Sequence, residues 1–455
     1  MKKNFVLLFL MIISSLIFCQ ELTVKNEVSI GNSSDNYLQE AIKLSNEEYA
    51  LFGFTEDRNS ASLFIVFVDN EFEIIDSISI NLGVPSPEFY NYPVKKIEDG
   101  FILGFNHKLI KLNSTGEIIW ERNLDDQITT IEDLHVAVDG YYLVGEIHKS
   151  TYNGIILKVD LNANTVWRKE IEDSRYVYLN SIEQTTNSNL LITGFIWGIS
   201  ESDQAIIILC SEQGNIINNN FLDTEIYGLP SERSLTKSKF DNNFYLGSIG
   251  GINGILLKLD PNGNLIWRKS YDPPPNTKLV INSIHELENN NLMLLGTARY
   301  TIGISIITSD FHIINTDGNG NRLYSQSLKS SSDMCISNSL NIDANCEIEL
   351  FGSSYYNNTG MDFSIICLEY PLSNTIEYLS AEIFIYPNPV ESEITFKDSN
   401  STSKEIKIFN LLGQLVYFNK DIYTELNLPE LNKGSYIMHV TEQSNQTKST
   451  IFIKN

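Results

Sequence analysis

Short apolar runs separated by polar turns recur along the middle of the chain. Seven of these runs close on glycine: YALFG, FILG, YYLVG, LLITG, FYLG, LMLLG and IELFG end at Gly53, Gly104, Gly145, Gly194, Gly247, Gly296 and Gly352. The glycines recur at intervals of about 50 residues, the length of one multi-strand repeat unit. Another short strand precedes each run, as at residues 179–186 and 280–287.

A second unit follows each glycine-terminated run. Residues 109–121, 157–169 and 257–269 are near copies of it, and residues 63–76, 206–218 and 312–324 are degenerate versions. Each copy is an apolar strand, a polar turn with Asn or Gly, and a second strand. Each period therefore predicts four antiparallel strands, which is typical of a propeller blade. We expect an all-β chain with a seven-bladed β-propeller over residues 21–380; an open β-solenoid and an eight-bladed ring are the alternatives.

The seventh repeat has no room for its outermost strand before the C-terminal region begins. Residues 22–31, LTVKNEVSIG, resemble the outer strand of the other repeats. We therefore expect the first strand of the chain to pair with the last blade and close the ring, which removes exposed strand edges.

The C-terminal 75 residues resemble the type A sorting domain of type IX secretion cargo from Bacteroidota. The matching landmarks are Tyr386, Pro387, Asn388 and Pro389, then Gly413 in NLLGQ, then Leu431, Gly434 and Tyr436, and the terminal strand to Lys454. The chain departs from the family pattern in having Lys448-Ser449-Thr450 before the last apolar run. Turn residues between alternating strands predict a small Ig-like antiparallel β-sandwich over residues 381–455. An ordinary Ig-like domain is the alternative.

This resemblance implies an export route and its partners. The expected partners are the type IX secretion machinery and a sortase-like processing protease, and the expected location is outside the cell or attached to its outer surface. The resemblance does not distinguish release from anchoring.

The N-terminus has the three parts of a secretory signal within residues 1–20. Lys2 and Lys3 precede an apolar stretch from Phe5 to Phe18, and this stretch is too short for a spanning helix. Cleavage is expected around Gln20. Lipidation of Cys19 is an alternative, which Phe18 disfavours because a small residue usually stands there. No later segment predicts a membrane span.

Composition narrows the classes of partner. The chain has 455 residues and a formal net charge of −25. Nucleic-acid and anionic-lipid binding are disfavoured, because both need clustered Lys and Arg. An acidic surface keeps an exported protein soluble, and we expect a monomer.

The cysteines indicate no metal site. Cys335 and Cys346 lie in neighbouring predicted strands and are candidates for a disulfide, which export permits. Cys210 and Cys367 lie inside apolar runs and are expected to be buried thiols.

The repeat around DPNGNLIW resembles the motif of quinoprotein-type (PQQ) propellers. Its Asp-to-Gly spacing is one residue shorter here, and no cofactor-clasping site accompanies it, so no cofactor is expected. The resemblance implies that Trp120, Trp167 and Trp267 stack between blades and that Tyr324 takes their place in the sixth. The sialidase Asp-box fails on spacing.

No catalytic residue is predicted. His285-Glu286 does not continue into a zinc-protease motif because position 289 is Asn, and no nucleophile elbow is present. Asp317 and Asn319 resemble the head of a calcium loop, with Gln326 in place of the bidentate Glu. The repeat alignment places this segment in an inner hairpin turn, where such residues are expected anyway.

The leading hypothesis is a non-catalytic propeller that binds an extracellular glycan or protein. The rival is a hydrolase or lyase acting on an extracellular polysaccharide through carboxylates around the central channel, which leave no linear motif. A third reading is a structural module of a larger surface assembly. Carboxylates converging on the axis would favour the rival.

Overall fold

The computed structural model describes residues 22–454 apart from 46–47, 58–59, 85–91, 125, 150, 199–202, 224–227, 288–289, 303–304, 329–333, 343–347, 357–359, 370–384, 387–388, 397–403, 411–414, 423–424, 429–430 and 443–446. Contacts divide the chain into two compact units, Met1–Tyr370 and Pro371–Asn455. The expected signal peptide, with Cys19, lies outside the described residues.

The first unit consists of seven four-stranded antiparallel arrays. Blade 1 is β2 (Asp35–Lys43), β3 (Glu48–Asp57), β4 (Ser60–Asp69) and β5 (Ile74–Val84). Blade 2 is β6 (Val94–Ile97), β7 (Gly100–Phe105), β8 (Lys108–Asn113) and β9 (Ile118–Asn123). Blade 3 is β10 (Thr130–Ala137), β11 (Gly140–His148), β12 (Tyr152–Asp160) and β13 (Thr165–Ile171). Blade 4 is β14 (Tyr176–Gln184), β15 (Leu190–Trp197), β16 (Gln204–Cys210) and β17 (Ile216–Asp223). Blade 5 is β18 (Leu229–Lys237), β19 (Phe244–Gly250), β20 (Asn253–Leu259) and β21 (Leu265–Tyr271). Blade 6 is β22 (Thr277–Glu286), β23 (Leu292–Ile302), β24 (Ser305–Thr316) and β25 (Arg322–Leu328). Blade 7 is β26 (Met334–Ile342), β27 (Ile348–Tyr356), β28 (Gly360–Glu369) and β1 (Thr23–Ile30), and it touches blade 6 through one parallel bridge, Ser309↔Met334.

The first strand of each blade lies at the axis of a closed ring. Neighbouring first strands contact one another all the way round, from β2 through β6, β10, β14, β18, β22 and β26 and back to β2. The seven-bladed propeller expected from the repeat pattern is therefore the observed fold. We call these seven strands the axial wall.

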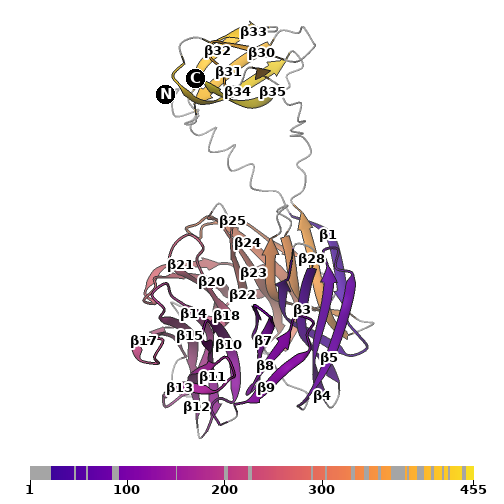
Figure 1. Cartoon of the computed structure of the whole chain (residues 1–455), viewed down its shortest axis with the longest axis vertical. Helices are drawn as coiled ribbons and strands as arrows, with labels where there is room; N and C mark the ends of the chain where they lie inside the picture. The colour runs from indigo at the N-terminus through magenta and orange to yellow at the C-terminus, as the bar shows by residue number, and fades with distance from the viewer. Residues whose placement is uncertain are drawn as a thin grey trace. The chain divides into compact units, whose positions relative to one another are not determined.

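The N-terminal strand closes the ring. β1 runs antiparallel to β28 from the pair Thr23↔Glu369 to the pair Ile30↔Phe363. Figure 1 shows the indigo β1 beside the orange β28. The expected pairing of the first strand with the last blade is confirmed.

The conserved-looking glycine of each repeat lies where two strands approach too closely for a side chain. In five blades the first strand bulges by one residue opposite this glycine, as at Leu38/Glu40 opposite Gly53 and at Leu179/Ser181 opposite Gly194. A Cβ on Gly194 would stand 2.0 Å from the carbonyl oxygen of Tyr178. The bulge therefore requires glycine on the second strand.

The hairpin between the third and fourth strands has the same form in blades 1 to 6. The residues that open these turns are Asp69, Asn113, Asp160, Ser211, Asp260 and Asp317, and the residue three positions later has a positive φ in every case. In blade 5, Gly263 N–H donates to the Asp260 carbonyl, and Asp260 N–H donates to the Asn264 carbonyl, both at 2.9 Å. Because the first strands form the axial wall, this is the outer hairpin. The expectation of an inner hairpin at residues 315–320 is wrong.

Hydrophobic cores lie between adjacent blades rather than within one. One core joins Ile102 and Leu109 of blade 2 to Leu143 and Leu157 of blade 3, and all four side chains are fully buried. Each blade therefore buries its two faces against its two neighbours, as a stacked repeat must.

The second unit is a small antiparallel β-sandwich. One sheet contains β29 (Ile385–Tyr386), β30 (Glu393–Phe396) and β33 (Glu425–Asn427); the other contains β32 (Leu415–Ile422), β31 (Lys404–Asn410), β34 (Gly434–Glu442) and β35 (Thr447–Lys454). Ile394, Ile406, Met438 and Phe452 are fully buried in its core. This matches the small sandwich expected for the C-terminal region.

Candidate functional site

The two ends of the propeller carry different kinds of turn. Since the strands of a blade alternate in direction, the turns between second and third strands and the connectors between blades emerge at one end. We call this end the connector face. The outer hairpins that contain Asp160, Asp260 and Asp317 emerge at the other end, which we call the hairpin face.

Six aromatic side chains form one continuous cluster on the connector face of blades 3 and 4. The aromatic platform consists of His148, Tyr152, Tyr176, Tyr178, Phe195 and Trp197. The ring of Tyr152 lies 4.1 Å from His148 and 4.9 Å from Tyr176, centroid to centroid. Tyr176 lies 5.7 Å from Trp197, and Tyr178 stacks on Phe195 at 5.0 Å.

Strand pairing places these rings together. Tyr176 is the direct cross-strand partner of Trp197, and Tyr178 is the partner of Phe195. The equivalent pair in blade 1, Tyr37–Phe54, stacks in the same way but packs against the core next to blade 2. On blade 4 the cluster reaches the surface, because Trp197 is 47% exposed. An exposed, pre-packed aromatic surface of this kind is a candidate recognition site.

Glu146 is the one charged residue at its repeat position. The residue after the repeat glycine is Phe in blades 1, 2 and 4, Ser or Thr in blades 5 to 7, and Glu146 in blade 3. Glu146 is 5% exposed, and its Oε2 has no hydrogen-bond partner among the residues that the structure describes. Its Oε1 lies 3.5 Å from His148 Nε2, and the imidazole side chain is 41% exposed. A buried carboxylate at a position that is uncharged in the other blades is a candidate for a functional role.

Burial and charge act on the tyrosines of the platform. Burial, followed by the nearby carboxylate of Glu146, raises the pKa of Tyr178 to about 12. The Tyr178 hydroxyl therefore stays protonated at neutral pH and can donate a hydrogen bond.

Hydrogen-bonding groups surround the platform. Glu170 accepts hydrogen bonds from Lys149 at 2.8 Å, from Asn153 at 2.6 Å and from Arg168 at 3.0 Å. Although burial favours the neutral acid, these three donors lower the pKa of Glu170 to about 2. On blade 4, Arg175 donates to Asp173 at 2.8 Å and to Gln204 at 2.9 Å.

A second group of ionisable side chains lies on the axial wall. Glu40, Lys95, Asp133, Glu183 and Arg233 come from the first strands of blades 1 to 5 in order. Lys95 Nζ lies 3.8 Å from Asp133 Oδ1, and 38% of the Lys95 side chain is exposed. Burial alone would lower the pKa of Lys95, but the charges of Asp133, Glu183 and Glu40 together raise it. The carboxylates therefore converge on a protonated lysine.

The Asp133 carboxylate accepts one backbone hydrogen bond on each of its two oxygens. Its Oδ1 accepts from Leu134 N–H at 2.8 Å, and its Oδ2 accepts from Ile182 N–H of the next blade at 2.9 Å. A carboxylate bound in this way joins two blades.

The aromatic residues singled out in the repeats lie at junctions between blades. Trp167 Nε1 donates to the Glu212 carbonyl of blade 4 at 2.8 Å, and its ring lies against Gly214. Trp267 lies against Gly320 of blade 6. Trp120 packs on the core between blades 2 and 3, and Tyr324 packs on the core that blades 6 and 7 share.

Asp317 and Asn319 lie in the outer hairpin of blade 6, on the hairpin face. Asp317 Oδ1 accepts from the N–H groups of Asn319 and Asn321 at 2.9 and 2.8 Å, and its Oδ2 accepts from Asn321 Nδ2 at 2.8 Å. Asp160 and Asp260 bind their own turns in the same way. Among the residues that the structure describes, no three His, Cys, Asp or Glu side chains gather in a way that could hold a metal ion.

The cysteines that the structure describes are buried. Cys210 is a free thiol in β16, and burial raises its pKa to about 11. Cys335 and Cys367 are buried in β26 and β28. Cys346 lies outside the described residues, so its pairing with Cys335 stays a prediction.

The sorting-motif residues lie at the strand ends of the second unit. Tyr386 pairs with Thr395 in β29, Pro389 lies in an exposed bend, and Lys454 forms a bridge with Val390. Leu431 packs on the sandwich core, and Gly434 opens β34 opposite Lys454. Tyr436 donates its hydroxyl to the Asn432 carbonyl at 2.8 Å and stacks on Phe452. Pro387, Asn388 and Gly413 lie outside the described residues.

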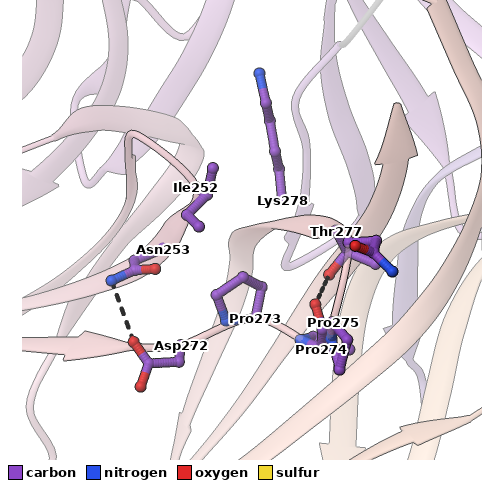
Figure 2. Close-up of a pocket in the computed structure, with 9 residues that line it drawn as sticks. Ile252, Asn253, Asp272, Pro273, Pro274, Pro275, Thr277 and Lys278 are labelled. Atoms are coloured by element: carbon purple, nitrogen blue, oxygen red, sulfur yellow. Dashed lines mark hydrogen bonds between the residues drawn. The ribbon is translucent and has the colours of Figure 1, made fainter. Parts of the chain in front are cut away.

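A shallow depression lies at the junction of blades 5 and 6. It has a volume of about 560 Å³ and is lined by Ile252, Asn253, Asp272, Pro273, Pro274, Pro275, Asn276, Thr277 and Lys278 (Figure 2). Asn253 donates to Asp272 at 3.4 Å, and Thr277 donates to the Pro274 carbonyl at 2.7 Å. Nothing in the repeat pattern marked this site, because it lies in a connector where the repeats differ.

Comparison with known proteins identifies the second unit. Residues 384–454 match the family model described as "Secretion system C-terminal sorting domain". The chain is 35% identical over 78 residues to the ulvan lyase NLR42 of Nonlabens ulvanivorans; the match covers 16% of this chain and only 15% of the lyase. The sorting domain implies interaction with the type IX secretion machinery and delivery to the cell surface or beyond.

Solved structures resemble the chain at low sequence identity. The periplasmic gluconolactonase PpgL of Pseudomonas aeruginosa aligns with a TM-score of 0.44 at 10% identity, over 74% of this chain and 99% of its own. A protein of unknown function from Dyadobacter fermentans aligns with a TM-score of 0.44 at 10% identity, over 77% of this chain and 99% of its own. Within the described residues, no helix is both long and apolar enough to cross a lipid bilayer.

Proposed function

We propose that this type IX secretion cargo is a non-catalytic extracellular propeller that binds a glycan on the aromatic platform. The observation that carries the proposal is the unbroken contact of His148, Tyr152, Tyr176 and Trp197 on an exposed face. Flat aromatic side chains offer sugar rings a large apolar contact at low cost in conformational entropy.

The surroundings of the platform fit a sugar. Hydroxyl groups need donors and acceptors at the edge of the stacked ring, and Glu170, Arg175 and Gln204 supply both. Arg175 already donates to Gln204, and Glu170 is already held by its own three donors, so binding has to order these side chains little further.

The test is a glycan array probed with the chain from residue 21 onward, in the native form and as Trp197→Ala. We expect the variant to bind the selected glycan about tenfold more weakly, the loss of one well-packed aromatic contact. Phe240→Ala is the matched control, because Phe240 is 50% exposed on the hairpin face. Absence of any bound glycan, or equal losses in the two variants, would overturn the proposal.

A second candidate function is an enzyme that acts on a polysaccharide. The observation that favours it is the pair of Glu146 and His148 beside the tyrosine hydroxyls, since a carboxylate can orient an imidazole for proton transfer. Release of reducing ends or of unsaturated products from a bound polysaccharide, abolished by Glu146→Gln, would establish catalysis. The ulvan lyase match is too short to support an activity for the propeller.

The proposal also covers the sorting domain. We expect a sortase-like processing protease to remove it or exchange it for an anchor during export, with the mature propeller acting as a monomer outside the cell.

A further inference from the structure

A groove with unpaired cations follows the outer strand of blade 5. The depression of Figure 2 adjoins a second one of about 250 Å³, lined by Lys269, Ser270, Tyr271, Asp272, Gly320, Asn321 and Arg322. Both are lined by Asp272. We call the two adjoining depressions together the basic groove.

Two cations of the groove differ from several lysines of the propeller that are held in ion pairs. Lys111, Lys158 and Lys258 form ion pairs with Asp99, Asp139 and Asp241 at 2.6 to 2.8 Å, one pair in each of blades 2, 3 and 5. Lys278 and Arg322 are exposed and make no hydrogen bond or ion pair within the described part of the chain.

The position of these cations is informative because the chain is acidic. A protein with a net charge of −25 has many carboxylates with which an exposed cation could pair. In Figure 2 the Lys278 side chain extends away from Asp272, whose carboxylate accepts from Asn253. Lys269 is the third cation of the groove, and its Nζ donates to Asn321 Oδ1 at 2.8 Å.

We infer that the basic groove binds the anionic groups of an acidic polysaccharide, either carboxylates or sulfates. Lys278 binds an anionic group at the first depression, and Arg322 and Lys269 bind another at the second. The guanidinium of Arg322 suits both groups, because its N–H donors match two oxygens at once.

The walls of the groove favour a saccharide over a peptide. A peptide usually gains affinity by hydrogen bonding to backbone N–H groups along its length. Pro273, Pro274 and Pro275 have no N–H to offer, and they hold the connector in a rigid form. The groove instead presents apolar ring surfaces between charged side chains, which suits sugar rings that carry acidic substituents.

The basic groove and the aromatic platform are built from different residues. Loss of one therefore leaves the other to be measured. The platform would bind sugar rings by contact area, whereas the groove would bind acidic substituents by charge.

The test measures binding of the chain from residue 21 onward to polygalacturonate and to dextran sulfate, with neutral dextran and poly-L-glutamate as comparisons. We expect at least one of the two acidic polysaccharides to bind, with affinity that falls steeply as salt rises, because screening weakens contacts between exposed charges. The affinities for polygalacturonate and for dextran sulfate show whether the groove prefers carboxylates or sulfates.

Two double variants isolate the groove from the total charge. Lys278→Gln with Arg322→Gln should weaken binding about tenfold, the loss of two charge-assisted contacts. Lys169→Gln with Lys433→Gln changes the net charge by the same two units at exposed positions elsewhere and should change binding less than about twofold. Failure to bind either polyanion, equal losses in the two double variants, or equal binding of poly-L-glutamate would overturn the inference. Trp197→Ala tests the platform separately and should leave polyanion binding in place.

Discussion

The side-chain amide of Gln326 binds both backbone groups of Leu22. Leu22 N–H donates to Gln326 Oε1 at 2.8 Å, and Gln326 Nε2 donates to the Leu22 carbonyl at 2.9 Å. The Tyr324 hydroxyl accepts from the same N–H at 3.3 Å. In blades 3 and 5, a tryptophan of the outer strand packs on the outer hairpin of the next blade. Blade 6 has no such hairpin beside it, because the third and outer strands of blade 7 are not consecutive in the chain. Its outer strand β25 contacts Leu22, the residue that precedes β1, instead.

Gln326→Ala should weaken the closure of the ring. The variant loses two hydrogen bonds to a buried residue, and we expect the free energy of unfolding to fall by about 2 kcal/mol. Urea unfolding followed by tryptophan fluorescence measures the change. Gln213→Ala, at an exposed turn position, is the control and should change stability by less than about 0.5 kcal/mol. Equal effects of the two substitutions would show that the contact with Leu22 contributes nothing.

Gly214→Ala should test the contact between blades 3 and 4. Gly214 has φ +82, and a Cβ there would stand 2.8 Å from the Trp167 ring. Gly251 has φ +65 with open space around it, so Gly251→Ala carries the backbone strain alone. We expect Gly214→Ala to lower the free energy of unfolding by at least about 1 kcal/mol more than Gly251→Ala does. Equal losses of unfolding free energy in the two variants would mean that the Trp167 ring moves aside at no cost.

His312 should make the propeller less stable as the pH falls below neutral. Burial, followed by the charge of Arg322, lowers the pKa of His312 to about 4, below the usual value of 6.5. The folded state therefore binds this proton less readily than the unfolded state, and its contribution to stability is complete above pH 6.5 and lost as the pH falls toward 4. Thermal midpoints of the native chain and His312→Gln, measured from pH 7 to pH 4, should diverge in this window at the expense of the native chain. Parallel curves would contradict the shift.

Deletion of residues 381–455 should stop export across the outer membrane. The match to the sorting-domain family covers residues 384–454, so the truncated chain lacks its export address. We expect it to accumulate in the periplasm, which fractionation and immunoblotting can measure. Unchanged appearance outside the cell would refute the assignment of this route.

The residues of the candidate site were harder to predict than the blades. Trp167 and Trp267 stood out because they recur at one repeat position. Glu146 could have been noticed, since it is the one charged residue that follows a repeat glycine, but its burial and its proximity to His148 depend on the fold. Lys278 lies in a connector with no counterpart in the other repeats. Residues that recur at one repeat position serve the structure of every blade. The residues of the candidate sites instead lie at positions where one blade differs from the others.

The sequence by itself determined the number of blades, the closure of the ring and the separate C-terminal sandwich. These follow from local chemistry, because bulges require glycine, outer hairpins require Asp, Asn or Gly, and each strand shows its apolar pattern. Only the tertiary structure decided that His148, Tyr152, Tyr176 and Trp197 form one surface and that Lys278 and Arg322 line two depressions that share Asp272. These residues come from separate strands and connectors, and only the packing of one blade against the next brings them together.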